Sequence, residues 1–281
     1  MKTAPLQETL AGDAAYDAYI AREPPCGREL RALFRSGERL VIFDVGACEG
    51  EDSIRYSRLY PRARIFAFEP LQANQDIIRR QFARRKAGRC ELVPLALSDR
   101  AGTATLHVSS GEPDEKFCGP DWNYGNKSSS LLAPGMTGRE WLPWLHFDRS
   151  ETVSTRTIDD FCTARGLDRV DFIHMDVQGA EWLVLQGARR MLPKIGGVWM
   201  EVAEAEAYRG QALRPKLEEF MRNSGFVLTF QELGGVEGNQ FYVNARLWRG
   251  RRRLAVRGAR RAARALLNGL RHLRIHSREK K

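Results

Sequence analysis

The chain has 281 residues, 43% of them hydrophobic, and a formal net charge of +10, a length that predicts one domain with tails. It has no run of eighteen apolar residues, no apolar leader and no CxxC pair among its five cysteines. This pattern argues against a transmembrane helix, a secretion signal, a disulfide framework and a zinc site. We therefore expect a cytoplasmic protein, whose cysteines stay reduced.

Short apolar segments alternate with amphipathic ones along most of the chain, after a helical lead-in over residues 1–38. The expected strands are 39–45, 64–68, 92–97, 170–175, 198–202, 226–231 and 240–244, and the expected helices are 51–59, 71–85, 157–165, 180–191 and 216–223. This order predicts an α/β domain over 39–245 with a seven-stranded, mostly parallel, doubly wound sheet. The short turn before the last strand predicts that this strand is antiparallel.

Residues 109–150 interrupt this alternation. They follow a short strand expected over 103–108, are rich in Gly, Pro, Ser and Trp, and show no clear period. A long insertion in a compact domain is usually a lid or a disordered segment, and the aromatic residues favour a lid.

The loop after the first strand and the end of the second strand predict a nucleoside site. Gly46 and Gly50 let the backbone turn tightly and approach a ligand, and Glu69, nineteen residues later, can accept hydrogen bonds from a ribose diol. A dinucleotide fingerprint needs a glycine where Cys48 stands, and the acidic residues that follow it repel a pyrophosphate. S-adenosylmethionine (SAM) has cationic groups and no phosphate. The loop therefore favours SAM, with Asp44 placed to receive its amino group.

The strand over 170–175 leads into a carboxylate, Asp176, at the mouth of the sheet. Methyl transfer to oxygen needs alignment of donor and acceptor and removal of the acceptor proton, so Asp176 is a candidate base. His174 is an alternative base, although its position one residue deeper in the strand favours a satisfied core histidine. Glu181 is a further candidate that also suits the start of a helix. We expect no metal, and Asp176 with Glu201 is the alternative that leaves a Mg²⁺ site open.

Six short segments occur in a fixed order along residues 39–245. They are Phe43-Asp44-Val45-Gly46-Ala47 with Gly50, Phe68-Glu69-Pro70, Ala96-Leu97-Ser98-Asp99 with Gly102, Ser128-Ser129-Ser130-Leu131, Thr157-Ile158-Asp159-Asp160, and Asp176-Val177-Gln178-Gly179-Ala180-Glu181. In this order they resemble FkbM-type methyltransferases. The chain departs from the family pattern at Cys48, His174 and Gln178, where Asn, Lys and Glu are usual.

The resemblance implies a class I, Rossmann-like SAM methyltransferase fold and O-methylation of a hydroxyl, often on a sugar, glycolipid or natural product. The residues that it places at the cofactor are Asp44, Gly46, Ala47, Gly50, Glu69, Leu97 and Ser98. In the insertion, Ser129 or Ser130 would hydrogen-bond a small-molecule or glycan acceptor, and Trp122 would stack on it. The alternative for Trp122, Tyr124, Trp141 and Trp144 is that they pack the lid onto the sheet.

Residues 246–281 form a basic tail. Residues 249–281 contain thirteen Lys or Arg and one acid, which leaves a net charge of −2 for residues 1–248 and disfavours nucleic acid as a partner. The leucines at 266, 267, 270 and 273 have helical spacing and predict either a solvated helix or a helix on the inner face of an anionic membrane. An RNA methyltransferase guided by this tail and a non-catalytic SAM-fold scaffold at a membrane remain as alternatives.

Overall fold

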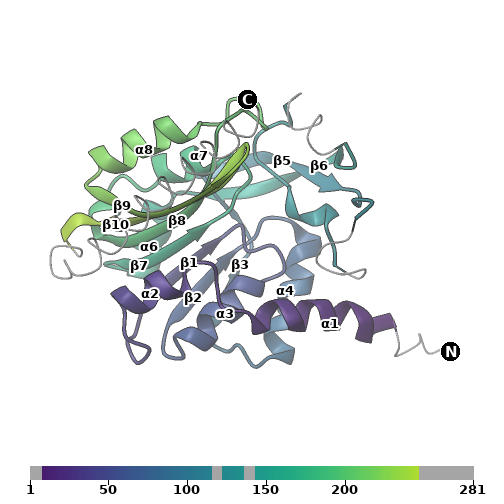
Figure 1. Ribbon diagram of the computed structural model, residues 1–281, viewed down its shortest axis with the longest axis horizontal. Helices are drawn as coiled ribbons and strands as arrows, with labels where there is room; N and C mark the ends of the chain where they lie inside the picture. Colours follow the sequence, from purple (N-terminus) through teal and green to yellow (C-terminus); the bar gives the residue numbers. More distant parts are fainter. Residues whose placement is uncertain (1–7, 116–121, 136–142, 247–281) are drawn as a thin grey trace, which may run out of the picture.

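The computed structural model describes residues 8–115, 122–135 and 143–246, which form a seven-stranded sheet with helices on both faces and a small three-stranded sheet (Figure 1). The strands of the large sheet are β1 (Val41–Val45), β2 (Arg64–Phe68), β3 (Cys90–Val93), β7 (Val170–Met175), β8 (Ile195–Ala203), β9 (Phe226–Gly234) and β10 (Glu237–Asn244). Their spatial order is β3–β2–β1–β7–β8–β10–β9, and within this sheet β10 is antiparallel to both of its neighbours, β8 and β9, while the other pairs are parallel. The predicted fold class, with an antiparallel last strand, is confirmed.

Each central strand contributes to two cores because successive side chains point to opposite faces of the sheet. Ile42 and Phe172 belong to a buried cluster shared with α2 (Gly27–Leu33) and α3 (Glu51–Leu59). Phe43 and Met175 belong to a larger cluster shared with α6, α7 and α8. Figure 1 shows α8 on one side of the sheet and α1 and α3 on the other. The bounds of the remaining helices are α1 (Glu8–Ala21), α4 (Gln72–Arg84), α6 (Ile158–Arg165), α7 (Glu181–Gln186) and α8 (Arg214–Asn223).

The segment that begins at Thr157 shows how short polar side chains fix the ends of these helices. The side chain of Thr157 caps α6 by accepting a hydrogen bond from the backbone nitrogen of Asp160 at 2.9 Å. Asp159 accepts hydrogen bonds from the backbone nitrogens of Arg190 and Met191 and so holds the turn after α7. Gly166 ends α6 with φ of 61°, a conformation that glycine adopts without strain. This family-like segment is therefore built into the scaffold.

Three predicted elements differ from the structure. The strand expected over 92–97 is divided at Pro94: β3 ends at Val93, and β4 (Ala96–Leu97) joins the small sheet, whose order is β4–β6–β5. The predicted helix 180–191 stops at Gln186. Residues 146–150, assigned to the insertion, begin an eleven-residue strand, β6 (His146–Arg156), which pairs with β5 (Gly102–Ser110). β6 is mostly exposed, so no apolar alternation marks it in the sequence.

The described ranges contain no helix long and apolar enough to cross a membrane. The four described cysteines, Cys26, Cys48, Cys90 and Cys162, are free thiols, and Cys118 lies outside the described residues.

Candidate active site

A pocket opens at the carboxyl ends of β1, β2 and β7. β1 lies between β2 and β7, so the chain order reverses at this point, which is where open α/β sheets bind their ligands. The small sheet and residues 126–131 of the insertion close the pocket from the other side. About 570 Å³ is unfilled, counting the space open to solvent at the mouth. Its lining of apolar side chains with a few polar ones is typical of small-molecule sites.

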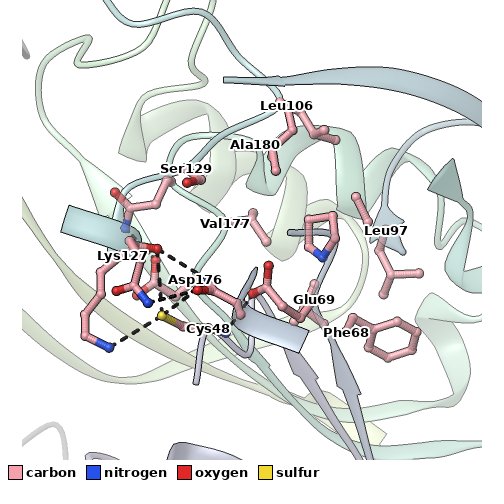
Figure 2. A pocket seen from close by; sticks show the side chains of 18 residues that line it. Cys48, Phe68, Glu69, Leu97, Leu106, Lys127, Ser129, Asp176, Val177 and Ala180 are labelled. Atoms are coloured by element: carbon pink, nitrogen blue, oxygen red, sulfur yellow. Dashed lines mark hydrogen bonds between the residues drawn. The ribbon is translucent and has the colours of Figure 1, made fainter. Parts of the chain in front are cut away.

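Glu69 is the buried carboxylate at the centre of this pocket. Figure 2 shows it pointing inward, with Phe68 and Leu97 on one side and Cys48, Lys127 and Asp176 on the other. Its two carboxylate oxygens accept hydrogen bonds from the backbone nitrogens of Cys48 and Leu71, each at 2.8 Å. Each oxygen has a second lone pair for a ligand hydroxyl. Burial raises the pKa of Glu69 to about 8, against the lowering effect of these two hydrogen bonds.

The two loop glycines are required by contacts within the protein. Gly46 has φ of 84°, and a Cβ there would lie 1.8 Å from the carbonyl oxygen of Asp176. Gly50 has φ of 81°, and a Cβ there would lie 2.8 Å from the ring of Phe82. Cys48, between them, also has a positive φ of 50°, which Asn tolerates better than most residues. Close packing and backbone conformation therefore account for glycine at both positions, and only Gly46 lines the pocket.

Asp176 lines the pocket directly after β7, and its backbone nitrogen donates to the carbonyl oxygen of Val45 at 3.0 Å. The Gln178 side-chain amide donates to Oδ1 of Asp176 at 2.7 Å and approaches Glu201 at 3.4 Å. Gln178 has φ of 54°, an uncommon conformation that is found at functional sites. The amide of Gln178 thus orients the carboxylate of Asp176 at the pocket wall.

His174 lies on the face of the sheet that packs against α3, and its side chain does not line the pocket. Its Nδ1 atom is 3.5 Å from Asp44 and 3.9 Å from Asp52, and its ring packs edge-on against Tyr56. Burial lowers the pKa of His174, but Asp44 and Asp52 outweigh this effect and raise it to about 9. Since the imidazole is protonated at neutral pH and does not line the pocket, its geometry does not suit a general base.

The geometry also places Asp44 and Glu181 behind the pocket wall. Asp44 is buried, accepts a 2.6 Å hydrogen bond from Ser53 and faces His174, so its carboxylate does not line the pocket. Glu181 is buried and accepts hydrogen bonds from the backbone nitrogens of Val177 and Gly179 at 3.2 and 3.4 Å. Burial raises the pKa of Glu181 to about 7. Glu181 therefore holds the loop after β7, and Asp44 links β1 to α3 through Ser53.

Two polar side chains of the insertion, those of Asn126 and Lys127, bind the acidic residues that follow β1. Lys127 forms an ion pair with Glu51 at 2.7 Å and lies 3.4 Å from the sulfur of Cys48. Asn126 donates to Glu49 and to Asn74, both at 2.9 Å. Burial lowers the pKa of Lys127, but the neighbouring acids raise it above the ordinary value of lysine. The lid is therefore held over the loop by charge and hydrogen bonds.

Three insertion residues were predicted to bind the acceptor, and the structure separates them. Ser129 lines the pocket. Ser130 is buried, donates to the carbonyl oxygen of Gln178 at 2.7 Å and accepts from Leu132, so it fastens the lid to the loop after β7. Trp122 is buried against Tyr19 of α1, with ring centroids 4.9 Å apart, and packs the lid onto the body. Trp141 lies outside the described residues.

The pocket thus brings together only part of the predicted set. Gly46, Glu69, Leu97, Ser129 and Asp176 line it. The predicted residues that do not are Asp44, Ala47, Gly50, Ser98, Ser130, Trp122, His174 and Glu181. The residues that sequence reasoning missed include Asn74, Leu106, Asn126, Lys127 and Gln178. Asn126 and Lys127 directly precede the Ser128–Leu131 segment, and this adjacency was the available clue.

No group of three or more His, Cys, Asp or Glu within the described ranges is arranged to hold a metal ion. Asp176 and Glu201, the alternative pair for Mg²⁺, both contact the amide nitrogen of Gln178. A hydrogen-bond donor therefore lies between these two carboxylates.

Comparisons with known proteins give the family of this chain. The methyltransferase FkbM domain model matches residues 44–228. The 2-O-methyltransferase NoeI of Sinorhizobium fredii (strain NBRC 101917 / NGR234) is 34% identical over 207 residues, which cover 74% of this chain and 80% of that protein. The methyltransferase sdnD of Sordaria araneosa is 27% identical over 195 residues, covering 67% of this chain and 74% of that protein. Among solved structures, cofactor-bound Rv0187 from MTB has a TM-score of 0.46 at 15% identity and covers 86% of this chain and 91% of that one.

Proposed function

The chain belongs to the FkbM methyltransferase family and is a SAM-dependent methyltransferase, and we propose that it methylates a hydroxyl oxygen of a sugar, glycolipid or other natural product. The observation that carries this proposal is the placement of two carboxylates, Glu69 and Asp176, in one pocket at the ends of β2 and β7. The similarity to a protein named as a 2-O-methyltransferase supports oxygen as the methylated atom.

The donors and walls of the pocket fit SAM. Glu69 has lone pairs left for the two ribose hydroxyls, and Leu97 and Phe68 provide an apolar side for the adenine ring. The polar side, with Cys48 and Lys127, faces the amino-acid end of the cofactor in this orientation. The carboxylate of Asp176 then lies near the methyl group. SAM supplies a methyl group on a positively charged sulfur.

Asp176 aligns and deprotonates the acceptor in this proposal. Its Oδ1 atom is fixed by the hydrogen bond from Gln178, so we assign its other oxygen to the acceptor hydroxyl. Bound SAM would supply the methyl group to the hydroxyl oxygen, with its sulfur as the leaving group, and Asp176 would take the hydroxyl proton. Ser129, on the lid side of the pocket, positions the acceptor by a hydrogen bond.

Incubation with SAM that carries a deuterated methyl group tests the proposal. The labelled mixture contains the full chain and an extract of glycans and small natural products, and mass spectrometry with NMR locates the label. A methoxy group on a sugar or natural product is the expected outcome. Label found only on nitrogen, on carbon or in RNA, or no label in any fraction while SAM is bound, would contradict it.

Residues 249–281 lie outside the described residues, and we propose that this basic segment contacts an anionic membrane. The spacing of Leu270 and Leu273 and the thirteen Lys or Arg support a helix with one apolar face. Replacing Leu270 and Leu273 by Asp should weaken binding of the full chain to vesicles that contain phosphatidylserine. Unchanged vesicle binding by this variant would remove the proposal.

A further inference from the structure

Four arginines line a surface hollow at the edge of the sheet opposite the cofactor pocket. Each directly precedes or begins one of three neighbouring strands: Arg39 precedes β1, Arg62 and Arg64 lie at the start of β2, and Arg89 precedes β3. β1, β2 and β3 are adjacent and parallel, so their starts lie together. We call this feature the arginine hollow, which is lined by Arg39, Leu40, Val41, Arg62, Arg64 and Arg89.

The positive charge of the arginine hollow is only partly balanced by protein. Arg64 is 3.3 Å from Glu91, but Glu91 also pairs with Arg165 at 2.6 Å. In the part of the chain that the structure describes, no carboxylate forms an ion pair with Arg39, Arg62 or Arg89. Three like charges thus share one concave surface without a protein counterion.

The nearest acid on the neighbouring strand is also engaged. Asp171, at the start of β7, accepts a 2.8 Å hydrogen bond from the backbone nitrogen of Val41 and pairs with Arg169 at 3.1 Å. This acid fixes the start of β1 and adds a further arginine to the same edge. The four arginines are exposed at one edge of the sheet, and their surplus of positive charge makes this edge attractive to an external anion.

We propose that the arginine hollow is a binding site for a phosphoryl or pyrophosphoryl anion. Guanidinium groups bind phosphate oxygens through pairs of parallel hydrogen bonds, and several of them can converge on one tetrahedral group. The convergence of three strand starts brings four arginines to one hollow. The guanidinium group of Arg64 lies over the ring of Phe66, at 4.5 Å, and those of the other three form no ion pair with the described residues. The site is distinct from the methyl-transfer pocket because it lies at the opposite ends of β1 and β2. The proposal is independent of the acceptor assigned above.

The described chain ends at the same edge of the sheet. β10 is antiparallel to β8, so it ends beside the start of β8, where Asn244 donates to the carbonyl oxygen of Ile195 at 3.0 Å. The sequence continues from there into the basic residues 249–281. A phosphoryl group at this edge can belong to a soluble phosphate compound or to a lipid headgroup, and the experiment below separates the two.

The test is calorimetric titration of inorganic pyrophosphate into the full chain, with S-adenosylhomocysteine (SAH) present to fill the cofactor pocket. The test variant carries Arg39→Gln, Arg62→Gln and Arg89→Gln. The control variant carries Arg100→Gln, Arg149→Gln and Arg156→Gln, three exposed arginines in and beside the small sheet, and so has the same net charge and the same basic tail. Unchanged SAH affinity and thermal midpoint show that both variants are folded.

We expect saturable binding to the unmodified chain, weakened about tenfold or more in the test variant and changed less than about twofold in the control. No saturable binding, or equal weakening in both variants, would overturn the proposal, because net charge or the tail would then account for the data. Vesicles containing phosphatidic acid identify the source. If the test variant loses vesicle binding, the site takes a lipid headgroup; if it loses only pyrophosphate binding, the site takes a soluble phosphate compound.

Discussion

The Nδ1 atom of His174 lies 3.5 Å from a carboxylate oxygen of Asp44, and the two residues are register partners on the adjacent strands β7 and β1. Both side chains are buried, and Asp52 of α3 approaches the same nitrogen at 3.9 Å. The buried cation therefore joins two strands and a helix directly beneath the loops of the active site. Its position is the one at which FkbM-type sequences usually carry a lysine, which is also a cation.

Replacement of His174 by Lys should change how stability depends on pH. The pKa of His174 is about 9 in the folded chain and about 6.5 in an unfolded one, so its stabilising contribution is complete below pH 6.5 and is lost as pH rises through 9. A lysine keeps its proton across this range. The thermal midpoint of the His174→Lys variant, relative to that of the unmodified chain, should therefore rise as pH increases from about 6.5 to 9.5. A constant difference at all pH values would contradict the ion pair.

Replacement of His174 by Leu should destabilise the fold without removing a catalytic group. Asp44 would be left buried beside Asp52 without a cation, and loss of one partner of a buried pair costs about 3–5 kcal/mol. The free energy of unfolding from urea titration measures this loss. If the folded fraction of this variant retains SAH affinity, His174 acts on the scaffold; complete loss of SAH binding by folded protein would indicate a direct role at the cofactor.

SAH affinity should increase with pH because of Glu69. In the protein without ligand, burial raises the pKa of Glu69 to about 8. Ribose hydroxyls donate preferentially to the ionised carboxylate. Between about pH 6.5 and 8.5 we expect the dissociation constant to fall about tenfold. The Glu69→Gln variant should bind more weakly and show a flat profile over the same range. An equally steep profile in this variant would assign the dependence to another group.

Asp176→Asn should slow methyl transfer while leaving the cofactor bound. Asn cannot take the acceptor proton, so we expect kcat to fall by about 10²-fold or more with SAH affinity changed only slightly. Single-turnover kinetics with the acceptor identified by the labelling experiment measure this effect. A variant with unchanged kcat at all pH values would show that alignment alone drives the reaction.

Lys127→Met should loosen the lid. The variant loses the ion pair with Glu51 and the contact of the ammonium group with the ring of Trp122, at a cost of about 2 kcal/mol. Hydrogen exchange over residues 122–131 should become faster. Lys216→Met is the matched control, because Lys216 also lies over a tryptophan ring, that of Trp182, but is exposed and far from the lid in sequence. Equal exchange of the lid in both variants would contradict the role of Lys127.

The alternation of strands and helices, and the meeting of two acids at one edge of the sheet, were predictable from the sequence for physical reasons. Buried parallel strands appear as short apolar runs, and the residues at their carboxyl ends must meet at one edge, where Glu69 and Asp176 line the same pocket. The exposed strand β6 shows no such pattern, because it is held by backbone pairing with β5 and does not bury an apolar face.

The direction of individual side chains was harder to predict. Asp44 and Asp176 both lie near strand ends, but Asp44 points to the α3 face, where Ser53 and His174 hold it. Asp176 stands after its strand and lines the pocket. The lid contacts of Lys127 and Asn126 join residues more than fifty positions apart, and no local pattern encodes such contacts.

Calorimetric titration of SAH into the full chain, its Glu69→Ala variant and a Glu219→Ala control tests the central claim most directly. Glu219 is an exposed acid on α8, remote from the pocket in the sequence. The proposed site predicts one SAH per chain, binding weakened about thirtyfold or more in Glu69→Ala, and unchanged binding in the control, with circular dichroism equal in all three. Absence of SAH binding to the unmodified chain, or equal affinity in the Glu69→Ala variant, would contradict a cofactor site built around Glu69.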